Sequence, residues 1–405
     1  MKASVSAVNV VGAASRHHRR SAHALPARGI VWALTIGAAV RLLIIPLSHG
    51  WDFEVWDEAT RLLVHGVNPY TFWRDLLLAY PYLPVFLYIL LPLRWLALHT
   101  PIPFTVLGKL PMAIADLVVA ATLYRWVLRS GRSTRIAVLG ACLYLFNPLV
   151  LYNSAFLGRF DAVASAFLVL ALTTCGWRFS LCYALAVCTK TFPVLILPGL
   201  LLGRYRRTQR ELLGAIGVSL VVTLPFLLWD PRALLFNLTV LLTTHGTPLP
   251  TGLSWQYVLL QVISIGLYFR LAPAFYALML GAMLFWRNRP PLTLCALTFS
   301  FLLLIDHKVW EQYLTWPLPF LIALALIRRD IASGLLAAGM TLAALFMNEQ
   351  GRHPVDPLYY LLLVPYPPVL VNVLLALGII VYIVLAHRPR MTRQNLDDAE
   401  LKALQ

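Results

Sequence analysis

Residues 366–387 read YPPVLVNVLLALGIIVYIVLAH, a stretch without Asp, Glu, Lys or Arg. A helix needs roughly 20 predominantly apolar residues to cross a hydrocarbon core of about 30 Å, so this stretch is long enough to span a membrane. Residues 29–48, GIVWALTIGAAVRLLIIPLS, have a similar length and carry one charge. Backbone groups in lipid must be satisfied within the protein, which selects helices or closed barrels, and no tract shows the alternation of a barrel strand. The sequence therefore predicts an all-α membrane protein.

The composition of the whole chain agrees with this class. Of the 405 residues, 60% are apolar and 12% are charged, whereas about 25% of the residues of an average soluble domain are charged. The net charge of +16 comes from basic residues spread over short loops, which is the pattern of membrane topology rather than of a nucleic-acid-binding stripe. We expect membrane lipids, and no nucleic acid, as partners.

Apolar blocks recur along one domain without an internal repeat, and they predict a bundle of about 12 transmembrane helices over 29–387. Arg-rich loops mark the cytoplasmic side by the positive-inside rule, so residues 1–28 and 388–405 are predicted to be cytoplasmic tails. Two regions, 82–128 and 256–287, contain more apolar sequence than simple paired crossings need. The blocks lie at 29–48, 82–98, 108–128, 134–151, 160–175, 179–203, 211–229, 256–287, 291–306, 313–327, 331–348 and 366–387.

The block 179–203 is interrupted by Thr189-Lys190-Thr191-Phe192-Pro193. Because proline cannot continue a helical hydrogen-bond ladder, we expect two short helices that meet near the outer face. The five cysteines all lie within or at the edges of apolar blocks, without the spacing of a metal site, and are predicted to be buried and inert. They are Cys142, Cys175, Cys182, Cys188 and Cys295.

Acidic and aromatic residues gather in the loops that the topology places outside, above all in the first outer loop, 49–81. Its start, Trp51-Asp52-Phe53-Glu54-Val55-Trp56-Asp57-Glu58, holds four carboxylates. Residues 52–62 are predicted to form a helix lying in the membrane interface. Asp52 is the first carboxylate outside the lipid and so the best placed to meet a lipid-borne substrate, whereas Asp57 and Glu58 fit solvated helix-terminal charges better.

Lysine is rare, with five Lys against 28 Arg. Lys109, Lys190 and Lys308 lie in or beside apolar blocks, where an ionisable residue is costly and is a functional candidate. The alternative for each is a side chain that extends to the interface. Function is the better explanation of Lys190, and neither explanation is favoured for Lys109.

Two further clusters combine bases and acids beside predicted spans: Gly158-Arg159-Phe160-Asp161, and Asp306 to Tyr313. A guanidinium or ammonium stabilises a departing phosphate, and a carboxylate can deprotonate a hydroxyl nucleophile. Arg159 and Asp161 are equally well explained as a buried structural pair. His307 has no second His or Cys at ligand spacing, so we expect no metal site.

These motifs resemble the GT-C glycosyltransferases that use polyprenyl- or dolichyl-phosphate sugars. The resemblance is greatest to the mannosyltransferase branch that includes the first GPI-anchor mannosyltransferase and its prokaryotic relatives. It extends from residue 52 to 317 in family order. The stretches that carry it are Asp52, Gly66-Val67-Asn68-Pro69-Tyr70, Pro81-Tyr82-Leu83-Pro84, Phe146-Asn147-Pro148, Gly158-Arg159-Phe160-Asp161, Thr189-Lys190-Thr191-Phe192-Pro193 and His307-Lys308-Val309-Trp310-Glu311-Gln312-Tyr313-Leu314.

The resemblance implies inverting transfer of a hexose, most simply mannose, from a polyprenyl-phosphate donor to a lipid or glycan acceptor on the non-cytoplasmic face, without a cofactor. Relatives often show Asp-x-Asp where this chain has Asp52-Phe53-Glu54, so Glu54 is the weaker of the two candidates. The implied roles are catalytic for Asp52, Glu54 and Asp161; donor-phosphate binding for Lys190, Lys308, Arg159 and His307; and acceptor or sugar binding for Trp310, Glu311, Gln312 and Tyr313.

Two other functions fit parts of the pattern. A secondary transporter or a flippase of lipid-linked saccharide would share the intramembrane charges, but transporters commonly show repeated halves. A non-catalytic subunit would tolerate loss of Asp52. The preference for Arg over Lys suggests a prokaryote rich in GC, so we expect a plasma membrane, with an endoplasmic-reticulum membrane as the alternative.

Overall fold

The computed structural model describes residues 28–74, 80–240, 251–260, 262–345, 368–387 and 393–404. This part of the chain is helical, as predicted, apart from one pair of two-residue strands, β1 (Thr251–Gly252) and β2 (Lys308–Val309). The strands are parallel, with Thr251 opposite Lys308. The prediction of a purely α-helical chain missed this pair because two residues are too few to give a sequence pattern.

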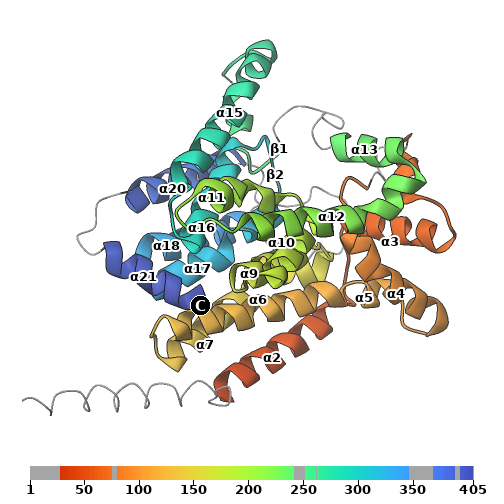
Figure 1. The fold of residues 1–405 in the computed structure, drawn as a ribbon, viewed down its shortest axis with the longest axis horizontal. Helices are drawn as coiled ribbons and strands as arrows, with labels where there is room; N and C mark the ends of the chain where they lie inside the picture. Colours follow the sequence, from red (N-terminus) through yellow and green to blue (C-terminus); the bar gives the residue numbers. More distant parts are fainter. Residues whose placement is uncertain are drawn as a thin grey trace, which may run out of the picture.

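The helices are arranged so that α3, α4 and α5 lie together at one end and α21 lies at the other (Figure 1). We call these the α3 end and the α21 end. The first half of the chain forms α2 (Arg28–Ile44), α3 (Trp51–Val64), η1 (Pro69–Arg74), α4 (Val85–His99), α5 (Phe104–Leu107), α6 (Leu110–Arg129), α7 (Thr134–Leu145), α8 (Pro148–Leu151), the π-helical turn η2 (Tyr152–Leu157), α9 (Asp161–Leu172), α10 (Trp177–Thr189), η3 (Phe192–Ile196) and α11 (Leu197–Leu202).

The second half of the chain continues the helical bundle, and its last helix is α21. It forms α12 (Gln209–Trp229), α13 (Pro231–Val240), α14 (Gln256–Leu259), α15 (Ile265–Trp286), α16 (Pro291–Ile305), η4 (Glu311–Thr315), α17 (Leu318–Ile327), α18 (Ile331–Leu345), α20 (Pro368–His387) and α21 (Arg393–Leu404).

Four of the described helices are long and apolar enough to cross a membrane: the continuous α5–α6 segment, α12, α15 and α20. A fifth span is possible if α7 and the α8–η2 segment, bent by 46°, are counted as one. Shorter apolar helices, such as α9, α16 and α17, fill the interior. The chain is therefore a multi-pass membrane protein, and the figure of about 12 spans stays a prediction.

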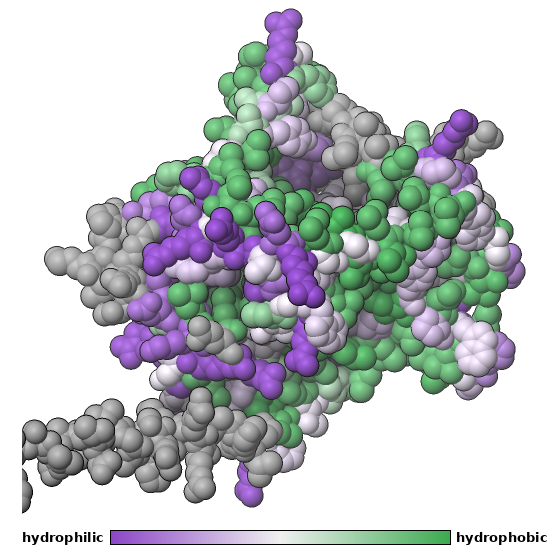
Figure 2. All heavy atoms as spheres, in the orientation of Figure 1, coloured by the Kyte–Doolittle hydropathy of each residue, from purple (hydrophilic) through white to green (hydrophobic). Residues whose placement is uncertain are grey.

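The outward surface of α12 shows how the helices meet lipid. Its large apolar side chains are exposed instead of packed, which would be unfavourable in water. Hydrophobic residues also cover the middle of the molecule in Figure 2, over α12. The exposed residues are Leu213, Ile216, Leu220, Val221, Leu224 and Leu228.

The structure explains why 82–128 seemed too apolar for paired crossings. α4 packs along α3, and Arg94 in its second half forms an ion pair with Asp57 and donates to the Thr60 hydroxyl. Phe104, just after α4, contacts Phe53 near the start of α3 with ring centroids 5.7 Å apart. α4 therefore stays at the α3 end, and at 15 residues it is shorter than the helices long enough to cross a membrane.

The predicted break in 179–203 is confirmed. α10 ends at Thr189, Lys190 adopts an extended conformation with φ −150° and ψ 143°, and Pro193 lies in the first turn of η3. Because the helix ends before it, Lys190 extends its side chain into the interior of the protein, where it is 5% exposed.

Two predictions from the sequence are corrected or decided by burial. Cys175 is exposed, in the turn between α9 and α10, and Cys142 and Cys182 are half-buried, so the expectation that every cysteine is buried holds only for Cys188 and Cys295. Lys109 is fully buried, and its Nζ donates to the carbonyls of Ile45 (2.6 Å), Ser48 and Phe156 (3.0 Å). Lys109 thus ties the end of α2 to η2 and is a structural residue.

The C-terminal segment is a packed helix rather than a plain tail. Asp397 and Glu400 of α21 pair with Arg328, which follows α17. Glu400 is fully buried and accepts hydrogen bonds of 2.9 Å from the backbone N–H and the hydroxyl of Thr293, in the first turn of α16. Hydrophilic residues gather around this end of the molecule (Figure 2).

Candidate active site

The site is built on the sharp turn between η2 and α9. Gly158 ends η2 in the left-handed region, with φ +76°, which a residue with a Cβ adopts at a cost. A Cβ at Gly158 would also lie 2.7 Å from the Phe53 ring. The Gly50 N–H donates to the Leu157 carbonyl at 2.8 Å. This turn therefore brings the start of α3 directly against Arg159.

Arg159 is the centre of the first charge cluster. Its Nε lies 3.1 Å from Asp52 Oδ2, and its Nη1 donates to Asn153 Oδ1 at 3.1 Å and to Glu311 Oε1. Arg159 and Glu311 are 2% and 1% exposed, whereas the Asp52 side chain is 33% exposed. We call Asp52, Asn153, Arg159 and Glu311 the Arg159 cluster. Within it, Asp52 is the carboxylate that an outside molecule can reach.

Asp161, the first residue of α9, belongs to a second cluster. Its Oδ1 accepts from Lys190 Nζ at 2.7 Å and from Trp316 Nε1 at 2.6 Å. Both charged side chains are at least nine-tenths buried. The helix N-terminus also favours the negative charge of Asp161. Asp161 and Lys190 therefore form a buried ion pair. The sequence allowed a buried structural pair as one explanation of Asp161, but with Arg159 as the partner.

Aromatic rings enclose the Lys190 ammonium. Its Nζ lies 5.2 Å from the centroid of Phe160, 5.4 Å from those of Tyr313 and Trp316, and 5.7 Å from that of Tyr82. Each ring face attracts a cation at this distance. The rings and Asp161 together offset the cost of burying the charge.

Tyr82 links the two clusters. Its ring packs edge-on against Phe160 at 5.0 Å. Burial raises the pKa of the Tyr82 hydroxyl well above its usual 10.0, with added contributions from Tyr313, Asp52 and Asp161. Tyr82 is therefore a neutral hydroxyl within electrostatic reach of both carboxylates, a role that the Pro81-Tyr82-Leu83-Pro84 motif did not reveal.

Residues 306–313 lie beside the Arg159 cluster, to which Glu311 belongs, and we call them the 306–313 wall. β2 pairs with β1, and Ser254 and Gln256 bind the carbonyls of Asp306 (2.9 Å) and Ile305 (2.7 Å). Burial raises the pKa of Asp306 to about 6. Burial also lowers the pKa of Lys308, against the opposing effect of Asp306.

His307 and the following residues complete this wall. The His307 Nδ1 lies 3.4 Å from Asp306 Oδ1, and burial followed by the charge of Lys308 lowers the pKa of His307. Trp310 is half-buried, and Tyr313 stacks on Trp316 at 4.3 Å. Glu311 Oε2 and Gln312 Oε1 are buried without a hydrogen-bond partner in the described part of the chain. Such atoms favour a ligand that can donate to them.

The structure does not bring every predicted residue into the clusters. Glu54 is two positions after Asp52, about 200° around the helix, and its side chain is 46% exposed beside His49 Nε2 at 3.9 Å. Asp57 pairs with Arg94, and Glu58 with Arg61 at 2.6 Å. These acids match the solvated or helix-supporting alternative.

Several residues of the clusters were missed by sequence reasoning. Asn153, Trp56 and Phe160 hold the Arg159 turn. Trp316 is 4% exposed and donates to Asp161. Trp56 contacts the ring of Phe160 at 4.7 Å. The signal was present in the aromatic density of 51–56 and 80–82, but aromatic belts give the same signal.

A family model described as Glycosyltransferase family 87 matches residues 80–306, more than half of the chain. The chain belongs to glycosyltransferase family 87. The matched region includes Arg159, Asp161 and Lys190, and lies between Asp52 and Glu311. A crystal structure of ArnT from Cupriavidus metallidurans in the apo state is similar, with a TM-score of 0.47 and 14% identity, covering 93% of this chain and 77% of that chain.

Membership of family 87 confirms the expectation of a membrane glycosyltransferase of GT-C type and favours it over the transporter and flippase alternatives. The lipid-linked donor and the acceptor in the membrane are expectations that the family match does not test. Mannose, the polyprenyl-phosphate donor and the roles of single residues stay predictions.

Proposed function

We propose that this family 87 enzyme transfers a hexose, most simply mannose, from a polyprenyl-phosphate donor to a lipid or glycan acceptor, with inversion and with Asp52 as the catalytic base. The observation that supports this most is the contrast in exposure within the Arg159 cluster: the Asp52 side chain is 33% exposed, and Arg159 and Glu311 are 2% and 1% exposed. A base must reach the acceptor, and the residues that hold it need not.

In the proposed step, Asp52 takes the proton of the acceptor hydroxyl. The acceptor oxygen forms the bond to the anomeric carbon while the bond from that carbon to the phosphate oxygen breaks. The polyprenyl phosphate leaves with the electron pair of that bond. Attack from the opposite face inverts the anomeric configuration in one displacement, so no covalent sugar–enzyme intermediate is required.

Arg159 positions the base in this proposal. Its guanidinium contacts Asp52 and Glu311 together, which fixes the position of the Asp52 carboxylate. An Arg–carboxylate contact also fixes orientation better than a lysine would, because the guanidinium donates from a rigid plane.

The departing phosphate is assigned first to Lys308 and His307, which are half-buried on the 306–313 wall. Lys190 and Arg159 add positive potential from within, and Asp161 holds Lys190 in place. Trp310, Gln312 and Tyr313 are assigned to the sugar or the acceptor, with Gln312 Oε1 as an acceptor for a sugar hydroxyl.

The test uses purified full-length protein in detergent, radiolabelled polyprenyl-phosphate-mannose and extracted lipid or glycan acceptors. Loss of a general base lowers the rate by roughly 10²- to 10⁴-fold, so we expect that loss for Asp52→Asn. Asp57→Asn is the matched control, because it neutralises a carboxylate of the same helix that pairs with Arg94. Equal transfer by wild type and Asp52→Asn would refute the assignment of the base.

The same assay is repeated with glucose and arabinose donors. Transfer from one of these instead of mannose corrects the sugar and keeps the mechanism. No transfer from any of the three by the wild type would refute the polyprenyl-phosphate donor.

We also propose that the α3 end faces outward across a plasma membrane, with both termini cytoplasmic. Arg129, Arg132 and Arg135 lie at the opposite end of α6, as the positive-inside rule requires of the cytoplasmic side. Cys175, exposed in the turn between α9 and α10, supplies a native probe. A membrane-impermeant maleimide should label it from the cytoplasmic side of vesicles; labelling from the outside would invert the topology.

A further inference from the structure

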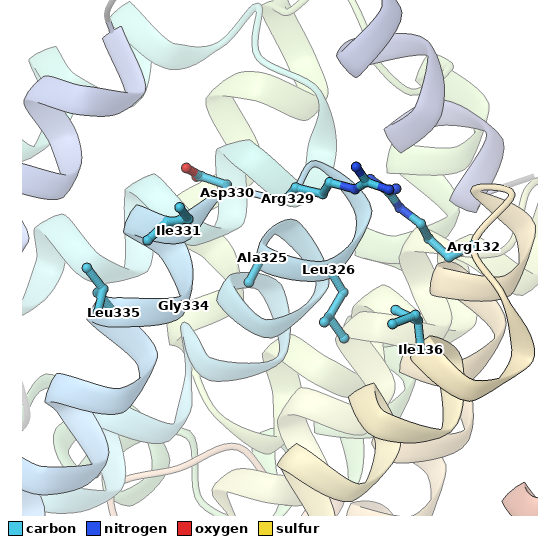
Figure 3. A pocket seen from close by; sticks show the side chains of 9 residues that line it. All are labelled: Arg132, Ile136, Ala325, Leu326, Arg329, Asp330, Ile331, Gly334 and Leu335. Carbon is cyan, nitrogen blue, oxygen red and sulfur yellow. The ribbon is translucent and has the colours of Figure 1, made fainter.

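A pocket of about 520 Å³ lies between the start of α7, the end of α17 and the start of α18. α17 begins beside η4 at the candidate active site and ends at this pocket, so the two lie at opposite ends of one helix. Figure 3 shows the lining side chains. Arg132 and Arg329 are at the rim, and the apolar walls include Ile136, Leu326, Ile331 and Leu335.

The two arginines at the rim direct their guanidinium groups toward one another (Figure 3). Arg132 is half-buried and donates from Nη2 to the Ile327 carbonyl at 2.5 Å, which satisfies the end of α17. Burial, followed by the positive charge of Arg329, lowers the pKa of Arg132. Two like charges at close quarters repel, and an anion between them would turn the repulsion into two charge-assisted hydrogen bonds.

The backbone at Arg329 supports a ligand independently. Arg329 has φ +54°, and it is the one non-glycine residue in the left-handed region within the described part of the chain. This conformation is unfavourable for a side chain as large as arginine. It sends Arg328 toward Asp397 and Glu400 of α21 while Arg329 reaches the pocket. Backbone strain of this kind is often retained where a ligand is bound.

The pocket combines this basic rim with apolar walls that continue onto the exposed surface of the protein. Ile331 and Leu335 are 77% and 69% exposed, so an acyl chain can lie against them. The one carboxylate of the lining, Asp330, is 9% exposed and accepts from the Ser333 hydroxyl at 2.7 Å, on the side away from Arg132 in Figure 3. The basic rim fits a phosphate group and the apolar walls fit an acyl chain, and a phospholipid carries both.

We propose that this pocket binds an anionic phospholipid, with the phosphate between Arg132 and Arg329 and an acyl chain along Ile331 and Leu335. The lipid holds the start of α7, the end of α17 and the start of α18 together. The site is separate from the donor and acceptor of the transfer reaction, and its occupation does not depend on the identity of the sugar.

Native mass spectrometry of the full-length protein in detergent tests the proposal, with phosphatidylglycerol and phosphatidylcholine as the two probes. The wild type is expected to retain phosphatidylglycerol in preference. Each basic residue near a membrane surface contributes about 1 kcal/mol to binding an anionic lipid, which corresponds to roughly fivefold weaker retention in Arg132→Gln or Arg329→Gly. Arg135→Gln is the control: it removes the same charge from an exposed position, the second residue of α7, that does not line the pocket, and should retain the lipid as the wild type does.

Arg329→Gly separates binding from folding. Glycine adopts φ +54° without strain, so the thermal stability of this variant, measured without added lipid, is expected to equal or exceed that of the wild type while lipid retention falls. Equal retention of the two lipids by the wild type overturns the proposal, as does equal loss in Arg135→Gln and Arg329→Gly. Displacement of phosphatidylglycerol by millimolar inorganic phosphate would assign the rim to a soluble anion instead and also overturn it.

Discussion

The Arg41–Asp116 cluster and the Arg159 cluster are both built around a buried arginine, but they differ in how their carboxylates are satisfied. Asp116 is fully buried, and both of its oxygens are bonded: Oδ2 to Arg41 at 2.9 Å and to Ser154 at 2.5 Å, Oδ1 to Tyr144 at 3.3 Å. In the Arg159 cluster, Asp52 is partly exposed and Glu311 Oε2 is unpaired within the described residues.

This difference separates a structural ion pair from a candidate catalytic one. A buried carboxylate with both oxygens bonded offers no acceptor to a ligand, and breaking its ion pair leaves an uncompensated charge. A cluster with one accessible carboxylate and an unpaired oxygen can exchange protons and accept hydrogen bonds from a substrate. The same residue types thus serve packing in one place and chemistry in the other.

The largest expected stability effect tests the structural half of the comparison. Asp116→Ala leaves the Arg41 guanidinium buried without its partner, which costs about 3–5 kcal/mol. Asp52→Ala should cost about 1 kcal/mol or less, because water reaches this carboxylate. Thermal unfolding in detergent measures both. A comparable loss of stability in the two variants would remove the distinction between the clusters.

The next effect concerns Arg159 as a positioning residue. Arg159→Lys keeps the charge, but an ammonium cannot hold Asp52, Asn153 and Glu311 in one plane. We expect kcat to fall by roughly 10- to 100-fold, since a misplaced catalytic group costs about that much, while KM changes little. Arg94→Lys, at the Asp57 pair, is the control and should leave kcat unchanged. A change confined to KM would indicate substrate binding instead.

The turn that joins the clusters should show an effect of about 1–3 kcal/mol. Gly158→Ala combines a positive φ with a Cβ placed 2.7 Å from the Phe53 ring. Gly131→Ala has a similar φ of +87° and nothing within 4 Å of the added Cβ, so it isolates the cost of φ alone. Urea or thermal unfolding should rank Gly158→Ala as the more destabilised. Equal effects would mean that the close approach of α3 is adaptable.

The smallest effect is a pH dependence at the 306–313 wall. Burial raises the pKa of Asp306 from 3.8 to about 6, so the folded state binds the proton more tightly than the unfolded state does. This group contributes most to stability below pH 4, and the contribution is lost as the pH rises through 6, a change of about 1–2 kcal/mol for a carboxyl that is partly exposed. The difference in unfolding temperature between wild type and Asp306→Asn should follow that course. A difference independent of pH would contradict it.

Comparison of the two clusters also shows how far sequence reasoning reaches. Asp52 was identified as the first carboxylate outside the lipid, and Lys190 as a costly charge at a helix break. The partners of both residues could not be predicted, because Asp52 pairs with Arg159 and Lys190 with Asp161, each in a distant segment of the chain. Glu54 was grouped with Asp52 because Asp52-Phe53-Glu54 stands where relatives often show Asp-x-Asp, although helical geometry directs Glu54 elsewhere.

The sequence by itself determined the class of the protein. Block lengths, charge composition and the positions of proline are local properties, and they predict membrane helices, the break at Lys190 and an interfacial helix after the first span. Only the tertiary structure decided that α4 stays at the α3 end, that Lys109 is structural and Asp52 accessible, and that Arg132 faces Arg329 across a pocket. Burial and pairing depend on which distant segments meet in space, and neither spacing nor composition contains that information.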